Sequence, residues 1–441
     1  MQPLGNFIGG AFVAPSGTAL VSRNPAADGA VVFETGYTVR AVTDAVEAAE
    51  AAQLAWSQLT QAQRAQHLDR FKAELAARAN DLADAIVIET GKIRSEAKQE
   101  VQTVLNRFDL VKAAMAADLK AGQVAPGEQL RYHALGVVGV IGPFNYPLHL
   151  CHAHVVPALL AGNTVIVKPS DITPLCGQRY AEAAHAAGLP AGVLNVVVGA
   201  GEVGAAMVAS RIRGLCFTGS WAVGRRILEG ALDRPEMLVA LEMGGKNTCV
   251  VLEDAAIRQA VHEVAVGAWL SAGQRCTGTE RVLVHRKIAD RFIPALADVA
   301  RGLAFGNPED PSVFAGPLAT HGALTKLEHA IDTAKKAGAK PIVAGERIAG
   351  GYYRTASMHQ LPDGVHHVPG YTDLEVFGPD LCVEIIDSDD EAIAVMRESQ
   401  YGFANAVFTG NAQRFERYYA EVRTGILNRN RSTNLASPKL P

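Results

Sequence analysis

The sequence predicts an α/β fold, in which parallel sheets are covered by helices. From Leu135 onward, short apolar runs typical of strands alternate with longer stretches of helical periodicity. A second alternation of the same kind starts after Glu242 and continues toward residue 428. Because parallel strands need crossover connections, this alternation favours sheets with helices on both faces. A chain of 441 residues has room for about two or three domains with sizeable cores.

The N-terminal region predicts edge structure followed by helices. Residues 1–36 contain short β-type runs broken by Gly and Pro, which are typical of hairpins: Asn6–Ile8, Phe12–Val13 and Val31–Phe33. From Val39 to about Asp118 the chain is rich in Ala, and its apolar residues recur at helical spacing. We expect this second segment to form a helical scaffold.

The two alternations give a set of predicted elements. In the first alternation, the predicted strands are Val137–Ile141, Thr164–Val167, Leu194–Val198 and Leu215–Phe217. The predicted helices lie near residues 148–161, 174–187, 202–210 and 222–231. In the second alternation, Asn247–Leu252 predicts a strand and Ala255–Ser271 predicts a long helix.

Charge and hydropathy exclude several classes of protein. With 41 basic and 45 acidic side chains, the net charge of −4 gives no electrostatic reason to expect a nucleic acid or an anionic membrane as the main partner. No apolar run reaches the ~18 residues of a transmembrane helix, and the N-terminus lacks a basic-then-apolar signal segment. We therefore expect a soluble protein of the cytoplasm.

The cysteines are scattered and include no Cys-x-x-Cys pair: Cys151, Cys176, Cys216, Cys249, Cys276 and Cys382. In a chain of this length they predict no disulfide framework, and we expect at most one or two reactive thiols. The remaining cysteines are expected to be buried as small hydrophobic residues.

His149, His152 and His154 form a cluster of potential metal ligands. No pattern of acidic residues or cysteines completes a metal site around them. We therefore expect this segment to be the start of an apolar helix, and we expect no metal.

A glycine fingerprint of dinucleotide-binding folds occurs at Gly199, Gly201 and Gly204, between a predicted strand and a predicted helix. An acidic residue usually accompanies it about 20 positions later, at the end of the next strand. Here that strand ends in Phe217-Thr218-Gly219-Ser220 and offers no carboxylate. Direct contact with a cofactor and ordinary strand-to-helix turn chemistry both stay open for this motif.

Six further segments stand out together. They combine glycine or proline with residues that can do chemistry: Gly142–Pro147, Val167–Asp171, Phe217–Ser220 with Gly224, Leu241–Gly245, Gly273–Thr277 and Glu375–Pro379. In their order and spacing, these segments resemble the aldehyde dehydrogenase superfamily over essentially the whole chain. Among its branches, Gly142–Pro174, Leu-Glu-Met-Gly-Gly and Ala-Gly-Gln-Arg-Cys-Thr are most similar to the N-succinylglutamate 5-semialdehyde dehydrogenases of bacterial arginine catabolism.

The resemblance implies a Rossmann-like cofactor domain and an α/β catalytic domain, with Cys276 at their interface. The implied NAD-binding domain comprises residues 1–110 and 135–242, and the implied catalytic domain comprises residues 243–428. Residues 111–134 would form a projecting oligomerisation hairpin.

The resemblance also implies a homo-oligomer. Family members usually continue past the Pro438 region into a tail whose strand joins a neighbouring subunit. This sequence stops at Pro441, before that tail. We therefore expect residues 429–441 to be a shortened C-terminal segment, and the implied assembly to depend on the tail.

Cys276 is the predicted nucleophile. It follows a predicted long helix, and Arg275 stands beside it; nearby positive charge or a helix end favours the reactive thiolate. Attack on an aldehyde gives a thiohemiacetal whose oxygen carries negative charge and needs hydrogen-bond donors. Asn145, rigidified by Pro143 and Pro147, suits a side-chain donor, and the resemblance pairs it with the Cys276 backbone N–H.

Glu242 is the predicted general base. Loss of hydride leaves a thioester that an activated water must hydrolyse, and Glu242 resembles the residue that does this in the family. It precedes Gly244-Gly245, a pair that permits close approach of the backbone to a cofactor. The alternative for a near-buried carboxylate at this place is a structural ion pair.

NAD is the cofactor that the resemblance implies, with NADP less favoured. Lys168 and Asp171 follow a predicted strand at its carboxyl end, where open α/β sheets bind ligands, and would contact the adenosine ribose. A carboxylate at residue 171 would repel a 2′-phosphate, which favours NAD. Gly219 and Ser220, with Gly224, open a predicted helix whose N-terminus can meet the pyrophosphate.

Glu375 and Phe377 resemble the pair that holds the nicotinamide ribose and ring, although a Glu-x-Phe-Gly-Pro turn on its own predicts only a loop. Arg107 and Arg275 are candidates for binding the substrate carboxylates, with ordinary surface charge as the alternative. We expect NAD-dependent oxidation of N-succinylglutamate 5-semialdehyde, or of a close semialdehyde, to the acid. Another aliphatic aldehyde dehydrogenase stays open as an alternative, as does a non-catalytic cofactor-binding or structural protein on the same fold.

Overall fold

The computed structural model describes residues 2–118 and 121–434. The chain forms two compact units. The first unit comprises Met1–Asn24, Ala30–Thr90 and Arg94–Glu242, and the second comprises Pro25–Gly29, Gly91–Ile93 and Met243–Pro441. Of the expected C-terminal segment, residues 435–441 lie outside the described part of the chain.

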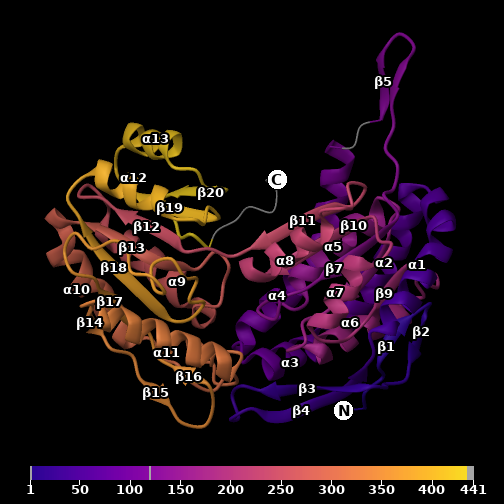
Figure 1. Ribbon diagram of the computed structural model, residues 1–441, viewed down its shortest axis with the longest axis horizontal. Helices are drawn as coiled ribbons and strands as arrows, with labels where there is room; N and C mark the ends of the chain where they lie inside the picture. The colour runs from indigo at the N-terminus through magenta and orange to yellow at the C-terminus, as the bar shows by residue number, and fades with distance from the viewer. Residues whose placement is uncertain (1, 119–120, 435–441) are drawn as a thin grey trace. The chain divides into compact units, whose positions relative to one another are not determined.

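A seven-stranded sheet forms the centre of the first unit, in the order β11-β10-β7-β8-β9-β1-β2 (Figure 1). Its strands are β1 (Asn6–Ile8), β2 (Ala11–Val13), β7 (Val137–Ile141), β8 (Thr164–Lys168), β9 (Leu194–Val196), β10 (Gly214–Gly219) and β11 (Leu238–Met243). β10, β7, β8 and β9 are parallel neighbours, whereas β1 pairs antiparallel with β9 and β2. β7 and β8 are buried along their whole length, as expected when helices cover both faces of a parallel sheet.

The described helices of the first unit are α1 (Arg40–Gln58), α2 (Gln61–Ala77), α3 (Ala79–Thr90), α4 (Arg94–Asp118), α5 (His149–Leu160), α6 (Pro174–Ala186), α7 (Gly201–Ala209) and α8 (Trp221–Ala231). The expected helical scaffold between Val39 and Asp118 is therefore confirmed, as four successive helices. α1 and α5 pack on β8, and α4 packs along α5. Trp56, Phe71 and Phe108 are fully buried in this core.

Two small antiparallel pairs stand outside that sheet. β3 (Thr18–Asn24) pairs with β4 (Ala30–Tyr37), although the sequence predicted only Val31–Phe33 in this region. β3 escaped prediction because Ser22 occupies one of its two buried positions, which breaks the apolar alternation. α4 continues through Asp118, and β5 (Gly122–Ala125) then pairs with β6 (Glu128–Leu130) in a hairpin that extends away from the helices of this unit (Figure 1).

The second unit contains another seven-stranded sheet in its described part, in the order β14-β17-β18-β13-β12-β19-β20. Its strands are β12 (Asn247–Val251), β13 (Thr279–His285), β14 (Lys340–Val343), β17 (Ser357–Gln360), β18 (Asp380–Ile386), β19 (Ala404–Phe408) and β20 (Ile426–Arg429), and β15 (Arg347–Ile348) and β16 (Tyr353–Arg354) form a separate pair. All neighbours in the large sheet are parallel except β14 and β17. The predicted fold class, with helices and two mainly parallel sheets, is thus confirmed.

The described helices of the second unit are α9 (Ile257–Trp269), α10 (Arg286–Gly302), α11 (His321–Lys336), α12 (Asp389–Glu398) and α13 (Ala412–Glu421). The predicted helix Ala255–Ser271 was too long at both ends, because α9 stops at Trp269 and gives way to a 3₁₀ turn. In that turn Ser271 and Ala272 have φ of 56° and 52°, so the backbone leaves the helical path just before Cys276.

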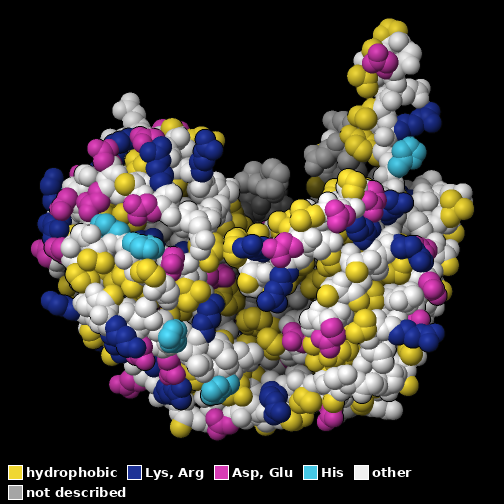
Figure 2. Space-filling view, in the orientation of Figure 1, with side chains coloured by type: hydrophobic (Ala, Val, Ile, Leu, Met, Phe, Trp, Pro, Cys, Tyr) yellow, Lys and Arg dark blue, Asp and Glu magenta, His cyan; other side chains and the backbone are white. Residues whose placement is uncertain are grey.

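Basic and acidic side chains are interspersed on the face of the molecule drawn in Figure 2. Such a mixture gives that face no extended region of one charge to attract a polyanion. None of the described helices is both long and apolar enough to cross a membrane.

Candidate functional site

Several predicted site residues of the first unit lie along one edge of its sheet. Lys168 is the last residue of β8, and it stands opposite Ile141 in β7, which in turn stands opposite Phe217 in β10. Asn145 follows β7 by four residues, and Gly219 is the last residue of β10. Because the carboxyl ends of parallel strands share an edge, the fold brings these segments together where α/β sheets bind ligands.

The loop that carries Asn145 is held at both of its ends. The Gly142 N–H donates to the carbonyl of Lys168 over 2.9 Å. At the other end, the buried carboxylate of Glu100 on α4 accepts hydrogen bonds from the backbone N–H groups of Leu148 and His149, both at 3.1 Å. Asn145 itself is only 7% exposed. Sequence reasoning missed Glu100, whose partners lie some fifty residues away along the chain.

Lys168 is a buried amine with acidic groups nearby. Its Nζ donates to the Pro169 carbonyl over 3.0 Å. Burial lowers the pKa of Lys168, while the negative charges of Asp171 and Glu202 act in the opposite direction. Asp171 is exposed, and Ser170 Oγ donates to its carboxylate over 3.3 Å.

Glu202 was also missed, although it lies inside the glycine fingerprint. That motif forms the turn from β9 into α7, which starts at Gly201. The Glu202 carboxylate accepts a hydrogen bond from Tyr37 Oη, and this bond lowers the pKa of Glu202. The fingerprint therefore supplies an acidic group beside Lys168, in a place that its usual spacing does not indicate.

Ser220 stands at the N-terminus of α8, as the sequence predicted. Its Oγ accepts a long hydrogen bond of 3.4 Å from the N–H of Val223, so the hydroxyl caps the helix. Gly224 lies on the first turn of α8 and is buried. Backbone N–H groups at this helix end are available to an anion.

Glu242 lies on β11, next to its last residue. Its side chain is exposed to solvent as a whole. The protein atoms packed around the carboxyl still desolvate it in part, which raises its pKa above the ordinary value. Cys216 on β10 is close enough that the charge of Glu242, together with burial, raises the pKa of that thiol to about 11. No ion pair holds Glu242 among the described residues, so the structure offers no support there for the structural alternative.

Cys276 lies on a loop of the second unit between the 3₁₀ turn and β13. Asn247 Nδ2, at the start of β12, donates to the Cys276 carbonyl over 2.7 Å and to the Gly278 carbonyl over 2.9 Å. Before the cysteine, Gly273 has φ of 72°, and a Cβ there would collide with the Gly378 carbonyl. The Cys276 loop therefore touches the Glu375–Pro379 segment. Apart from its position two residues after Gly245, nothing in the sequence predicted that Asn247 would hold the Cys276 loop.

Glu375 is folded against the glycine pair. One of its carboxylate oxygens accepts from the Gly245 N–H over 3.2 Å, and a Cβ on Gly244 would occupy the place of that oxygen. Burial and the nearby charge of Glu280 raise the pKa of Glu375 to about 7. Phe377 has φ of 59°, which is uncommon for an aromatic residue.

The two arginines proposed for substrate carboxylates have different surroundings. Arg275 donates through Nε to Ser271 Oγ over 3.0 Å. Arg107 on α4 is partly buried, which lowers the pKa of its guanidinium, and it makes no hydrogen bond or ion pair within residues 2–118 and 121–434. Its charge contributes to the low pKa values of His152 and His154 on α5.

His152 is a core residue. It packs against Phe71 and Phe108, and its Nδ1 lies 2.8 Å from Tyr180 Oη. Burial lowers the pKa of its imidazole to about 3. No group of three or more potential metal-binding side chains occurs within the described residues.

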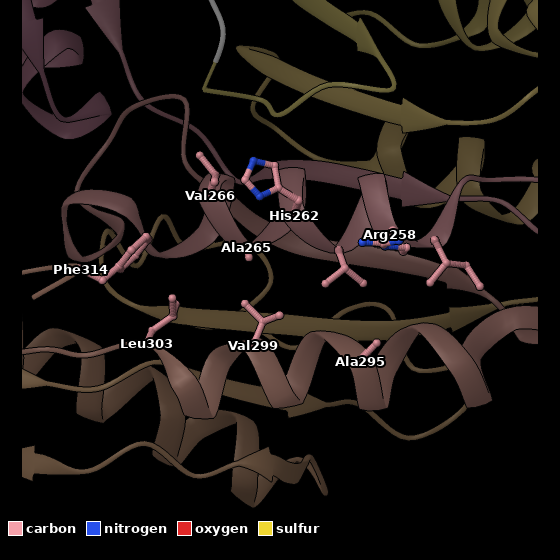
Figure 3. A pocket seen from close by; sticks show the side chains of 10 residues that line it. Arg258, His262, Ala265, Val266, Ala295, Val299, Leu303 and Phe314 are labelled. Carbon is pink, nitrogen blue, oxygen red and sulfur yellow. The ribbon is translucent and has the colours of Figure 1, made fainter. Parts of the chain in front are cut away.

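A groove of about 410 Å³ lies between α9 and α10, where side chains of the two helices face one another (Figure 3). Arg258 and His262 are its polar members, and the rest of its lining is apolar. None of the predicted site residues lines it. The groove is therefore separate from the chemistry described above.

Comparisons with known proteins find matches over nearly the whole chain. The Aldehyde dehydrogenase family matches residues 12–441. N-succinylglutamate 5-semialdehyde dehydrogenase from Chromobacterium violaceum is 37% identical over 99% of this chain and 90% of its own length. The enzyme of that name from Escherichia coli K12 is 36% identical over 99% of this chain and 89% of its own.

Solved structures agree as well. Lactaldehyde dehydrogenase from Escherichia coli superposes with a TM-score of 0.93 at 30% identity, covering 98% of this chain and 92% of that one. Betaine aldehyde dehydrogenase from Staphylococcus aureus, in complex with NAD⁺, gives a TM-score of 0.91 at 29% identity and covers 98% and 88%.

Proposed function

Because the chain belongs to the aldehyde dehydrogenase family and is an oxidoreductase acting on aldehydes, we propose that it oxidises N-succinyl-L-glutamate 5-semialdehyde to the carboxylate with NAD. The observation that carries this substrate is the 36–38% identity to dehydrogenases of that name, over 99% of this chain. We also propose a role in arginine catabolism, which the resemblance of the sequence motifs implies.

The proposed cofactor is a nicotinamide dinucleotide, and each unit by itself carries groups that suit one half of it. In the first unit, the Lys168 amine and the N-terminus of α8 suit the ribose and phosphates of the adenosine half. In the second unit, the Glu375 carboxylate can accept hydrogen bonds from the hydroxyls of the nicotinamide ribose, and the Phe377 ring can pack against the nicotinamide ring. When bound, the nicotinamide accepts the hydride. On this basis residues 1–110 and 135–242 form the NAD-binding domain, and residues 243–428 form the catalytic domain.

In the proposed mechanism, Cys276 Sγ attacks the aldehyde carbon. The oxygen of the resulting thiohemiacetal carries negative charge, which the Asn145 side chain and the Cys276 backbone N–H stabilise by hydrogen bonding. Asn247 supports this arrangement, because it fixes the carbonyl of Cys276 and so the orientation of the loop. Collapse of the thiohemiacetal with loss of hydride leaves an acyl thioester on Cys276.

Glu242 completes the reaction by taking a proton from the water that hydrolyses the thioester. A raised pKa suits a general base, because it brings the basicity of the carboxylate closer to that needed near neutral pH. Its solvent exposure gives it access to water, and the lack of an ion pair in the described residues leaves its oxygens able to accept a proton.

Asp171 is the proposed determinant of NAD over NADP. Its exposed carboxylate stands three residues beyond the end of β8, and its charge acts on Lys168. A carboxylate beside the adenosine ribose accepts hydrogen bonds from the two hydroxyls and repels a 2′-phosphate.

Arg107 is the proposed ligand of a substrate carboxylate. A partly buried guanidinium without a partner in the described residues is costly unless an anion binds it. Glu100, seven residues earlier on α4, holds the backbone that follows Asn145, so Arg107 lies about 10 Å further along the helix. The proposed substrate has carboxylates several bonds from its aldehyde, and one of them is the proposed partner of this guanidinium.

The proposed assembly is a homo-oligomer. Large apolar side chains are exposed at three places: on α8 and directly after it (Trp221 and Leu232), on β11 (Leu238), and on the β5–β6 hairpin (Val124 and Leu130). Exposed apolar patches of this kind mark interfaces between subunits. Light scattering on the 441-residue chain, and on the same chain extended by a family-like tail, tests this proposal: a species of more than one chain in either supports it, and a monomer in both at micromolar concentration overturns it.

The experiment that tests the proposed function compares NADH formation with N-succinylglutamate 5-semialdehyde and with neutral aliphatic aldehydes of similar length. We expect the semialdehyde to give the highest kcat/KM. Arg107→Gln should remove most of that preference, whereas Arg179→Gln, an arginine on α6 paired with Glu182, should leave it unchanged. A higher kcat/KM with neutral aldehydes would replace the proposed substrate, and no NADH with any aldehyde would contradict the proposed mechanism.

A further inference from the structure

Glu280 is a buried carboxylate next to the candidate site that the mechanism above does not use. It lies on β13, four residues after Cys276. One of its oxygens accepts from Lys246 Nζ over 2.8 Å, and the two side chains are 5% and 1% exposed. An ion pair buried this deeply is costly to desolvate, and it is retained only where further hydrogen bonds satisfy it.

Those further bonds come from the Glu375–Pro379 segment. The Glu280 carboxylate accepts from the backbone N–H of Val376 and from that of Phe377, both at 2.8 Å. Two successive N–H groups that converge on one carboxylate form an anion-binding concavity. At Phe377 the backbone has φ of 59°, which costs free energy unless the surroundings hold it. Glu280 helps to hold it there through the hydrogen bond from the Phe377 N–H.

Lys246, the partner of Glu280, fixes the other backbone segment that contacts the Glu375 carboxylate, namely Gly244-Gly245. It directly follows Gly245, whose N–H donates to the Glu375 carboxylate. Its ammonium group lies 5.1 Å from the centre of the Tyr371 ring, and Tyr371 Oη donates to Asp380 over 2.7 Å. The buried ion pair therefore links the Val376–Phe377 backbone to the Gly244–Lys246 segment, against which the Glu375 carboxylate is held.

We propose that Glu280 and Lys246 are positioning residues for the nicotinamide half of the cofactor, which act by fixing the Glu375–Phe377 turn against Gly244-Gly245. This inference rests on the proposed function, in which Glu375 and Phe377 hold the nicotinamide ribose and ring. Neither side chain touches the reacting atoms in this account. They affect how tightly the nicotinamide end of the dinucleotide binds and how it is oriented.

Glu280→Gln tests the proposal, because Gln keeps the shape and one acceptor but loses the charge. We expect its Kd for NAD, measured by calorimetry on the purified protein, to rise about tenfold, equivalent to about 1.4 kcal/mol. The Kd for ADP, which lacks the nicotinamide ribose, should stay within about twofold. The KM for NAD should rise in parallel, while the KM for the aldehyde changes little.

Two further variants separate positioning from loss of stability. Glu384→Gln breaks the neighbouring buried pair with Arg281, which joins β18 to β13 at 2.8 Å without contacting residues 375–377. It should lower Tm yet leave the Kd for NAD unchanged. Lys246→Met combined with Glu280→Gln removes the unpaired buried charge, so Tm should recover relative to Glu280→Gln while the Kd for NAD stays high.

The outcomes distinguish the inference from the function on which it rests. If the wild-type protein oxidises aldehydes with NAD and Glu280→Gln keeps its Kd for NAD, the positioning role is wrong and the proposed function stands. If Glu280→Gln weakens NAD and ADP equally, or if Glu384→Gln weakens NAD as much, the effect is general and the positioning role is again wrong. If the wild-type protein binds no NAD, both fail.

Discussion

The two units place their candidate site residues in different ways. In the first unit, Lys168 and Gly219 are the last residues of parallel strands, so the sheet itself sets their positions, and Asn145 lies only four residues beyond such a strand, on a loop that Glu100 holds. In the second unit, Cys276 and Glu375 lie on loops, and buried polar side chains set their positions through backbone hydrogen bonds. A substitution at the sheet edge should therefore change only the function of the substituted residue. A substitution on the loops should also displace the neighbouring segments.

The largest effect is expected from the nucleophile on its loop. Cys276→Ala removes the sulfur that forms both covalent intermediates, so aldehyde oxidation should fall by at least about 10³-fold. NAD should still bind, because its proposed contacts come from other residues. NADH formation and calorimetry measure the two quantities. Cys176→Ala, a buried cysteine on α6, is the matched control and should keep the wild-type rate. Activity near that of the control in Cys276→Ala would rule out the covalent mechanism.

At the sheet edge, Asn145→Ala should act on the transition state. Loss of one donor to a developing oxyanion costs about 10²–10³-fold in kcat, or about 2.7–4 kcal/mol. Because Glu100 and Lys168 hold the loop through backbone groups, its conformation should survive the substitution. Steady-state kinetics measure kcat, and Tm reports the fold. An unchanged kcat would remove Asn145 from the oxyanion role.

Gly244→Ala tests whether a change in one loop of the second unit displaces a residue of another loop. The new Cβ would collide with the Glu375 carboxylate, which must then leave its place on the Gly245 N–H. We expect the KM for NAD to rise about tenfold. Gly302→Ala, at a position in α10 where a Cβ meets nothing within 4 Å, is the control. Equal KM values in the two variants would mean that Glu375 does not hold the cofactor.

The smallest effect is expected at Asp171. Its charge is exposed, and exposed charge interactions contribute about 0.2–1 kcal/mol, so Asp171→Ser should shift the ratio of kcat/KM for NAD and NADP toward NADP by up to about fivefold. The same ratio for Asp81→Ser, an exposed acidic residue at the start of α3, should not move. A shift in both variants would point to net charge, and a shift in neither would place Asp171 away from the ribose.

The contrast between the units also explains how much the sequence could predict. Strand ends such as Ile141 were predictable, because short apolar runs bounded by Gly and Pro mark buried parallel strands, and β7 agrees with its prediction residue for residue. The ends of the predicted helix Ala255–Ser271 were wrong, because the positive φ values of Ser271 and Ala272 come from packing that periodicity does not encode.

The supporting residues could not be predicted from local pattern. Glu280 binds Lys246 at a separation of 34 residues and the Phe377 backbone at a separation of 97, so no window of sequence contains the interaction. Glu202 was inside a recognised motif, but its link to Lys168 arises only when the first turn of α7 comes close to the Lys168 side chain. The candidate chemistry-bearing residues were predicted by motif and stay predictions, whereas the residues that hold them needed the structure.

Cys276 and Glu242 are proposed to act in separate half-reactions, and the Glu242→Gln enzyme tests this separation. Gln keeps the shape of the side chain but cannot take a proton from water, so the first half-reaction should proceed and the second should stall. Rapid mixing with NAD and the semialdehyde, followed by intact mass spectrometry, measures both halves. We expect a burst of about one NADH per chain, a slow steady state and an acyl adduct on Cys276. Absence of both the burst and the adduct, in a variant that still binds NAD, would contradict this separation.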